Sequence, residues 1–331
     1  MPRATLLAEW LYEEGIGENR AILVEDGAIL EAAIELPNDL RFGAIVSGRL
    51  ATILAKGRRG LVSTAGNWIV IEPLPSGVTQ GQKVRVEIVR EPIAEPGNPK
   101  YAKGRITDRE EQAGPSLLEQ IGDCTILRPV DPDRFEQAGW SELLEEASSG
   151  DIPFGGGALR MSLTPAMTLF DVDGDLPPLD LAVAGAAAAG ASIRRLGIGG
   201  SIGIDLPTLP GKADRQRAAA ALDAVLPRPF ERTAINGFGF LQVIRRRERE
   251  SLPELLQFDP VGAAARALLR RASRVPGVGA RRLIASPAVV DRLEANPAWI
   301  SALTLSMGCP LRLQANAAYA TWSGHVESIQ S

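Results

Sequence analysis

The stretch "MTLFDVDGDL", Met167–Leu176, joins an apolar run to three carboxylates. Its first half, Thr168–Val172, is β-branched and aromatic, which is typical of a buried strand. Asp171, Asp173 and Asp175 are spaced two apart, so a continuing strand would carry them on one face. Carboxylates this close repel one another unless a cation, a proton or a positive partner offsets their charge. The pattern therefore predicts a strand end that receives a positive partner.

Strands and helices alternate around this stretch. Strand-like segments are "ALRMSLTPAMTLFDVD", "GSIGIDL" and "ERTAINGFGFLQVIRRRERE", and helix-like segments are "LDLAVAGAAAAGASIRRLG" and "KADRQRAAAALDAVL". Such a βαβαβ series predicts a mainly parallel or mixed sheet with helical cover.

A second carboxylate, Asp205, ends the strand "GSIGIDL". Ligands of open α/β sheets bind outside the carboxyl ends of the strands. Asp171 and Asp205 would lie about 5 Å apart on neighbouring strands, or about twice that if one strand intervenes. They could share a divalent ion, for which Mg²⁺ is the usual choice beside phosphate, and which could activate water at a phosphodiester. An Asp at a strand end can equally cap a helix, so both interpretations stay open.

Five short β segments with Gly, Asn and Pro turns occupy Phe42–Thr107 and predict a closed barrel of the OB type. Before them, "AILVEDGAILEAAIEL" alternates around Asp26-Gly27, a hairpin signal. Cations and aromatic residues occur together in the barrel segment: Lys56, Arg58, Arg59, Lys103, Arg105, Trp68 and Tyr101. Such a mixture fits single-stranded RNA binding, and it fits an ordinary solvated barrel surface equally well.

The remaining segments are shorter units. Residues 108–155 are less regular and include an acidic helix predicted over Phe135–Ala147, and a small α+β tail follows Pro253. The run "RRRERE" leaves the core sheet with Arg245, Arg246, Arg247 and Arg249. It could face phosphates, but the interrupting glutamates also make it compatible with a solvated charge run.

Composition limits the function classes. The net charge of −4 gives no global attraction to nucleic acid, although arginine, which dominates the basic residues, suits phosphate contacts. Cys124, Cys309 and His325 are the only cysteines and histidine, too few for a zinc site within one chain. Carboxylates close to the N-terminus argue against a signal peptide, and the apolar run "LAVAGAAAAGAS" is too short to span a bilayer. We therefore expect a cytoplasmic protein without membrane contact.

The segments "LFDVDGD", "IRRLGIGGSIGIDLPTL", "DRQRAAAALDAVL" and "GFGFLQVIRRRERESL" together resemble the catalytic core of the RNase E/RNase G endoribonucleases. The resemblance is collinear and covers most of the chain. It implies a multidomain α/β fold, α+β overall. The implied parts are N-terminal strands of an RNase H-like unit (1–35), an inserted OB-fold barrel (36–108), a reduced linker and RNase H-like remainder (109–155), a DNase I-like nuclease core (156–257) and a small C-terminal domain (258–331).

The resemblance also implies an activity. Members of this family are Mg²⁺-dependent endoribonucleases that leave 5′-phosphate and 3′-hydroxyl ends on single-stranded RNA, with Mn²⁺ as an alternative ion. Their metal-binding, catalytic aspartates match Asp171 and Asp205, and an Asn of the family corresponds to Asp173, a further candidate ligand. The residues expected to bind RNA are Trp68, Lys56, Arg58, Arg59 and Lys103 of the barrel and Arg245, Arg246 and Arg247 beside the core.

Besides Asp173, four further departures from the family pattern are visible. Gly237 replaces an Arg, and the helix after the first Asp is nearly all apolar. The Cys-Pro-x-Cys zinc link is missing, and the region that would sense an RNA 5′ end is much shortened. The chain is therefore expected to be a minimal member whose oligomer, if it forms one, is not linked by zinc. The alternative is an RNA-binding protein of the same family with impaired catalysis.

Overall fold

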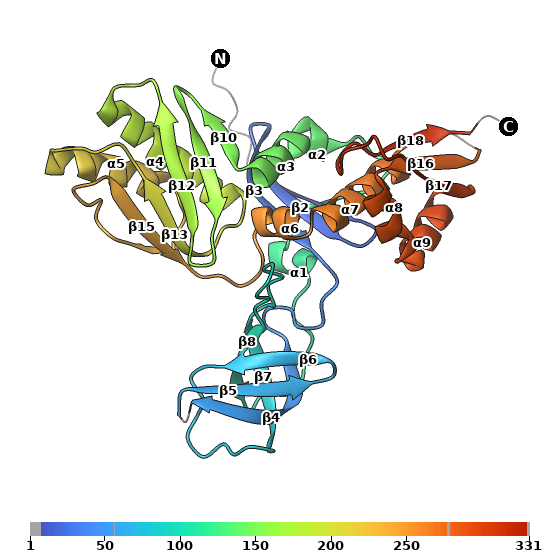
Figure 1. The fold of residues 1–331 in the computed structure, drawn as a ribbon, viewed down its shortest axis with the longest axis horizontal. Helices are drawn as coiled ribbons and strands as arrows, with labels where there is room; N and C mark the ends of the chain where they lie inside the picture. Colours follow the sequence, from blue (N-terminus) through green and yellow to red (C-terminus); the bar gives the residue numbers. More distant parts are fainter. Residues whose placement is uncertain (1–7, 56, 277–278, 330–331) are drawn as a thin grey trace.

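The computed structural model describes residues 8–55, 57–276 and 279–329. Within these ranges the strands form one closed barrel and three open sheets. Figure 1 shows the barrel as a separate body below the open sheets and their helices.

The N-terminal strands form an antiparallel sheet: β1 (Glu9–Glu14), β2 (Asn19–Glu25) and β3 (Ala28–Glu35). Asp26 and Gly27 join β2 to β3 with positive φ values of 49° and 80°, as two-residue hairpin turns require. A later strand, β9 (Thr125–Leu127), adds to β1 in parallel, giving the order β3-β2-β1-β9. The predicted hairpin is confirmed, and part of the irregular segment completes its sheet.

The predicted barrel is closed and has five strands. They are β4 (Ile45–Ala55), β5 (Arg59–Thr64), β6 (Asn67–Ile71), β7 (Lys83–Arg90) and β8 (Ala102–Thr107), in the order β4-β5-β6-β8-β7. Antiparallel pairing of β4 with β7 closes it, and β6 and β8 are parallel. Inward side chains such as Leu50, Val62 and Ile69 fill a core of its own. This arrangement is compatible with an OB fold.

The prediction of one continuous helix over Phe135–Ala147 is wrong. The chain instead forms α2 (Arg134–Gln137) and α3 (Trp140–Ser149), after a short α1 (Leu117–Ile121). Gly139 has a φ of 91° and separates the two helices. Phe135 and Trp140 are both buried and meet edge to face, with ring centroids 5.3 Å apart. Residues five apart do not share a helix face, so the break lets both rings enter one core.

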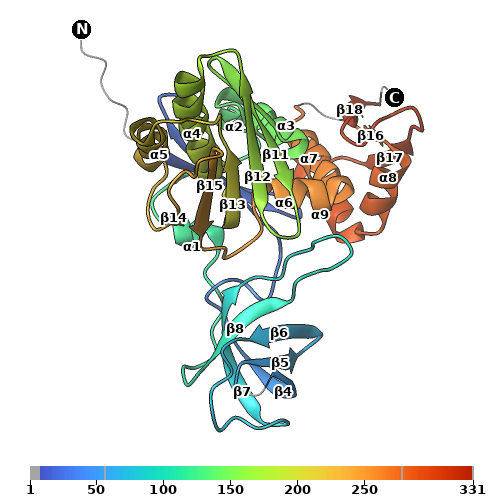
Figure 2. The same ribbon diagram turned by 60° about the vertical axis from the view of Figure 1, so that its left-hand side comes forward.

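The core sheet is mixed, as the alternating pattern predicts. Its strands are β10 (Asp151–Phe154), β11 (Gly157–Leu163), β12 (Thr168–Gly174), β13 (Gly200–Asp205), β14 (Glu231–Arg232) and β15 (Phe240–Arg245). The order is β10-β11-β12-β13-β15-β14, with only β12 and β13 parallel among these strands. The helices α4 (Pro178–Arg195) and α5 (Lys212–Val225) cover one face and leave the other open (Figure 2).

The apolar character of α4 has a structural cause. Gly185 sits so close to Val172 of β12 that a Cβ would collide with it, and a Cβ on Gly190 would lie 2.7 Å from Val225 of α5. The helix is therefore in contact with the sheet on one side and with α5 on another, and it also contacts β3. Its small residues permit this close packing, and one hydrophobic core runs from the N-terminal sheet into the six-stranded sheet.

The C-terminal part is a small α+β unit. It contains α6 (Leu252–Phe258), α7 (Pro260–Ser273), α8 (Pro287–Glu294), α9 (Pro297–Met307), β16 (Arg281–Ala285), β17 (Leu311–Ala315) and β18 (His325–Ser328). Its sheet has the order β17-β16-β18. Ion pairs from Arg266 to Glu18 and from Arg274 to Glu13 join α7 and its C-terminal end to the N-terminal sheet.

The predicted mixed α/β fold with a closed five-stranded barrel is thus confirmed, and its several sheets are consistent with a multidomain α+β protein. The assignment of the sheets to RNase H-like and DNase I-like units stays a prediction. In the described ranges no helix combines the length and apolarity that crossing a membrane would take.

Candidate functional site

Asp171 and Asp205 lie side by side on the open face of the core sheet. They are Cα partners in the parallel pairing of β12 with β13, so no strand intervenes, and the strands are about 4.8 Å apart. Both side chains are exposed, whereas Phe170 and Ile204, one residue earlier on each strand, are buried against the helices. The alternation that fills the core therefore also aims both carboxylates outward.

A third carboxylate follows along β12. Asp173 is exposed on the same face and pairs with Arg160 of β11, with Nε 3.4 Å from Oδ2. Arg160 is itself the Cα partner of Asp171. Arg160 is not predicted as a site residue from the sequence, because its only signal is a polar position between Leu159 and Met161 in an alternating strand.

The donor set fits a partly hydrated divalent ion. In the described part of the chain, neither Asp171 nor Asp205 has an ion pair or a side-chain hydrogen bond, so their oxygens are available. No group of three or more His, Cys, Asp or Glu residues arranged to hold an ion occurs there either. Mg²⁺ usually takes only one or two carboxylates and completes its shell with water and substrate phosphate. The two aspartates can therefore hold Mg²⁺, with Asp173 beside them and already paired.

The surface next to the carboxylates is apolar. A Cβ on Gly203 would lie 2.6 Å from the Phe240 ring and 2.7 Å from Leu169, so these two side chains meet over the glycine. Phe240 is the Cα partner of Asp205. Beyond it, Phe238 is 85% exposed in the turn that leads into β15. The carboxylates therefore adjoin an aromatic surface that the sequence analysis had not singled out.

The barrel brings most of its predicted RNA-binding residues to one outer face. Ile69 of β6 pairs in parallel with Ala102 of β8, so Trp68 and Tyr101, one residue earlier on each chain segment, are neighbours pointing outward. They are 40% and 48% exposed. Arg58 is exposed in the turn before β5, whereas Lys56 lies outside the described residues.

The two remaining barrel cations are not free. Arg59 and Lys103 both pair with Glu72, at 3.2 and 3.1 Å. The hydrogen bond from Lys103, supported by Arg59, lowers the pKa of the Glu72 carboxyl. Because Arg59 is exposed and Glu72 and Lys103 are half-exposed, an incoming phosphate can compete with this carboxylate for the cations.

The arginine run lies at the other end of the core sheet from the carboxylates. Arg245 pairs with Gly200 at the start of β13, whereas Asp205 ends the same strand. Five residues of strand separate these positions by about 17 Å. The Asp171–Asp205 pair is therefore out of reach of this run, and Arg160 is the arginine next to the pair.

Two arginines of the run have internal partners. Arg245 donates from Nη1 to the carbonyls of Ile193 and Ile198, each at 3.3 Å, at the C-terminal end of α4 and just beyond it, and burial lowers its pKa. Arg247 pairs with Glu254 of α6. Arg246 is more exposed, and its guanidinium carbon lies 5.0 Å from the centre of the Phe42 ring.

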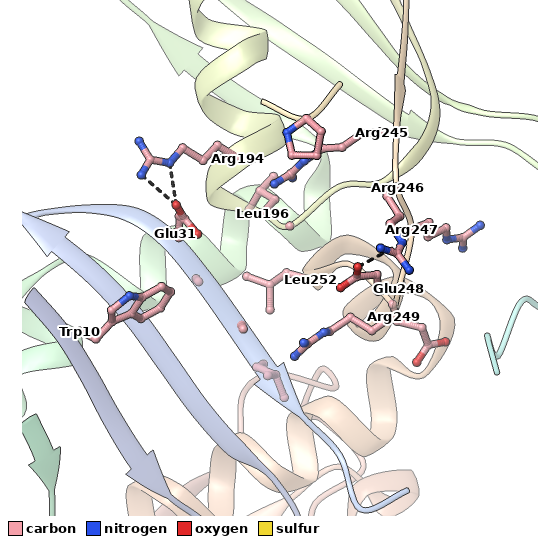
Figure 3. Close-up of a pocket in the computed structure, with 16 residues that line it drawn as sticks. Trp10, Glu31, Arg194, Leu196, Arg245, Arg246, Arg247, Glu248, Arg249 and Leu252 are labelled. Carbon is pink, nitrogen blue, oxygen red and sulfur yellow. Dashed lines mark hydrogen bonds and ion pairs between the residues drawn. The ribbon is translucent and has the colours of Figure 1, made fainter. Parts of the chain in front are cut away.

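A cavity of about 390 Å³ opens beside this run (Figure 3). The arginine segment, the end of α4 and strand β3 line it, and the Trp10 ring lies on the opposite side from Arg249. A second cavity of about 450 Å³ shares Ile34, Arg249 and Glu250 with it and reaches Trp68 and Tyr101 of the barrel. The arginine run and the aromatic barrel face are therefore connected by adjoining cavities.

The barrel meets the core at the amino ends of the core strands. Lys100 of the barrel loop lines a small recess with Thr168, Gly200 and Arg247. The carboxylates lie three and five residues further along β12 and β13, about 10 to 17 Å away. A nucleic-acid strand that contacted both the barrel and the carboxylates would have to run along the open face of the sheet.

We found no protein-family model that matches the chain and no match among curated proteins.

Proposed function

We propose that the protein is a Mg²⁺-dependent endoribonuclease that cleaves single-stranded RNA and leaves 5′-phosphate and 3′-hydroxyl ends. The observation that carries this proposal is the pairing of Asp171 with Asp205 on adjacent parallel strands, both exposed and both without a cation partner among the described residues. Two unpaired carboxylates so close together are costly without a positive ligand.

Each residue near the pair has a role in this proposal. Asp171 and Asp205 would hold Mg²⁺, which supplies charge neutralisation and an activated water when bound. Arg160, the Cα partner of Asp171, would exchange Asp173 for a non-bridging phosphate oxygen. Trp68 and Tyr101 would stack bases at the barrel, which holds the strand while a more distant phosphate lies at the carboxylates.

A second candidate is an RNA-binding protein without catalysis. Two observations favour it: Arg160 is occupied by Asp173, and a Cβ at Gly237, where the resembling family has an Arg, would meet nothing within 4 Å. The second observation means that no described residue occupies the space next to Gly237. The barrel face and the cavities near Arg249 would then be the functional surface.

A cleavage assay separates the two candidates. We expect an unstructured RNA to be cut in Mg²⁺ and left intact in EDTA, with 5′-phosphate products. Asp205→Asn should abolish cleavage and leave RNA binding within a few-fold of wild type, because the ion serves chemistry more than docking. Asp175→Asn is the matched control, since it removes the same charge from an exposed position just beyond β12. Binding without any Mg²⁺-dependent cleavage would favour the second candidate.

A further inference from the structure

An aromatic side chain stands almost fully in solvent beside the carboxylate pair. Phe238, flanked by Gly237 and Gly239, is 85% exposed. A singly exposed apolar residue is common on protein surfaces and by itself indicates nothing. Two further features distinguish this one: the turn that holds it is fixed, and it lies at the end of the sheet that carries the carboxylates.

The turn is held from both sides. The Asn236 Oδ1 atom accepts hydrogen bonds from the backbone N–H of Phe238 at 2.9 Å and of Phe240 at 3.0 Å. Thr208 donates from Oγ1 to the Phe238 carbonyl at 3.3 Å. Gly239 has a φ of 95°, and a Cβ there would collide with the Leu206 carbonyl. The backbone is therefore fixed while the ring gains almost no burial, so folding stability does not explain the ring.

The turn lies directly against the residues that follow Asp205. Leu206 donates its N–H to the Gly239 carbonyl at 3.2 Å, and Phe240 is the Cα partner of Asp205. Phe238 is two residues from Phe240, at most about 7 Å along the chain. A nucleotide adjoining a phosphate at the carboxylate pair would therefore come within reach of the ring.

We infer that Phe238 is a stacking platform for the base of a nucleotide next to the scissile phosphate. This inference rests on the proposed function and adds to it the requirement for an unpaired base at the site. A base within a duplex already stacks on its neighbours, whereas an unpaired base can turn onto a protein ring. The platform would thus make the carboxylate site select single-stranded RNA without reading its sequence, because every base has a stacking face.

The test compares Phe238→Ala, Phe238→Trp and the control Leu305→Ala, whose side chain in α9 is also 85% exposed. Loss of one stacked base corresponds to about a 5- to 150-fold loss in kcat/KM for Phe238→Ala on a short single-stranded RNA. The tryptophan variant should retain activity, and the α9 variant should match wild type. A set of RNAs that each lack one base near the cleavage site locates the stacked base. On the RNA that lacks the stacked base, Phe238→Ala and wild type should have the same kcat/KM. Equal losses on normal and abasic RNAs, or an unchanged kcat/KM, would overturn the inference.

A binding measurement keeps this test separate from the proposed reaction. In the Asp205→Asn background, an RNA carrying 2-aminopurine should show quenching that Phe238→Ala removes and Phe238→Trp restores. If the wild-type protein cleaves no RNA, the proposed reaction is wrong. The quenching measurement then still shows whether a base stacks on Phe238. Quenching unchanged by Phe238→Ala would overturn the platform alone.

Discussion

Arg20 and Glu13 form an ion pair inside the protein, with Nη2 3.0 Å from Oε1 and each residue only 2% exposed. The guanidinium also lies 4.0 Å from the centre of the Phe135 ring and 5.0 Å from that of Trp140. Burial lowers the pKa of Arg20 to about 10. The Glu13 carboxylate therefore supplies the countercharge for Arg20, and it also pairs with Arg274 just beyond α7.

Glu13→Gln should destabilise the protein by about 3–5 kcal/mol, because it removes the carboxylate that pairs with the buried Arg20 guanidinium, whereas Arg274 keeps Asp133 at 3.3 Å. Urea unfolding followed by circular dichroism measures the change. Glu327→Gln is the control, since its carboxylate pairs with His325 at the surface and should matter by about 0.5 kcal/mol or less. Equal effects of the two variants would show that the interior pair is not needed for stability.

Glu250→Gln should stabilise the protein at pH 7. Burial raises the pKa of Glu250, although the hydrogen bond that it accepts from the Ala94 N–H at 2.6 Å opposes this shift. A carboxyl whose folded pKa is raised contributes stability below its unfolded pKa of about 4.3, and this contribution is lost as pH rises through the higher folded pKa. Glutamine keeps an acceptor for Ala94 and carries no charge.

The melting temperatures of wild type and Glu250→Gln should therefore differ most at pH 7 and converge toward pH 4. The charged groups that act on this carboxyl, Glu254, Arg247 and Glu91, are the same in wild type and in the variant. A difference that stays constant with pH would mean that the ionisation of Glu250 does not enter the stability of the fold.

Local chemistry accounts for what the sequence predicts correctly. The Asp26-Gly27 turn depends on two residues that tolerate positive φ, and the barrel strands depend on alternation between Gly, Asn and Pro turns. The apolar strand that ends at Asp171 is visible in the same way. Each of these features is decided by residues adjacent in sequence.

Pairing between distant segments was not predictable. Whether a strand lies between Asp171 and Asp205 depends on strand order, and the structure places none there. Because β15 runs antiparallel to β13, Arg245 is carried to the end of the sheet away from Asp205. The same antiparallel pairing brings the turn at Phe238 next to the carboxylates. Neither direction nor register is encoded by periodicity alone.

Glu72→Gln should strengthen RNA binding by about two- to fivefold at low salt, because it frees Arg59 and Lys103 on the aromatic barrel face. If both released cations contact phosphates, the slope of log affinity against log salt should steepen by about 1.4. Fluorescence anisotropy of a labelled single strand measures both quantities. Glu327→Gln, which removes the same charge from the C-terminal unit, should change neither. An unchanged affinity and slope for Glu72→Gln would place RNA binding elsewhere.

The chemistry of an RNA 5′ end should not affect cleavage by this protein. Recognition of a 5′-monophosphate needs an arginine and hydroxyl donors held in fixed geometry. The segment available for such a pocket, residues 108–155, has only three basic residues, and each lies beside an acid whose charge repels a phosphate. Arg109 pairs with Glu87 at 3.3 Å, Arg128 with Asp131 at 3.2 Å, and Arg134 with Glu9 at 2.6 Å.

We therefore expect the protein to cleave 5′-monophosphate and 5′-hydroxyl RNAs at the same rate, entering on internal single-stranded regions. Initial rates on oligonucleotides that differ only at the 5′ end measure this, with Asp205→Asn as the blank. A preference of tenfold or more for the monophosphate, about 1.4 kcal/mol, would contradict the expectation. Arg249 would then be the residue to change first, because it lines both cavities between the arginine run and the barrel, and its guanidinium bonds to the neutral Gln120 amide.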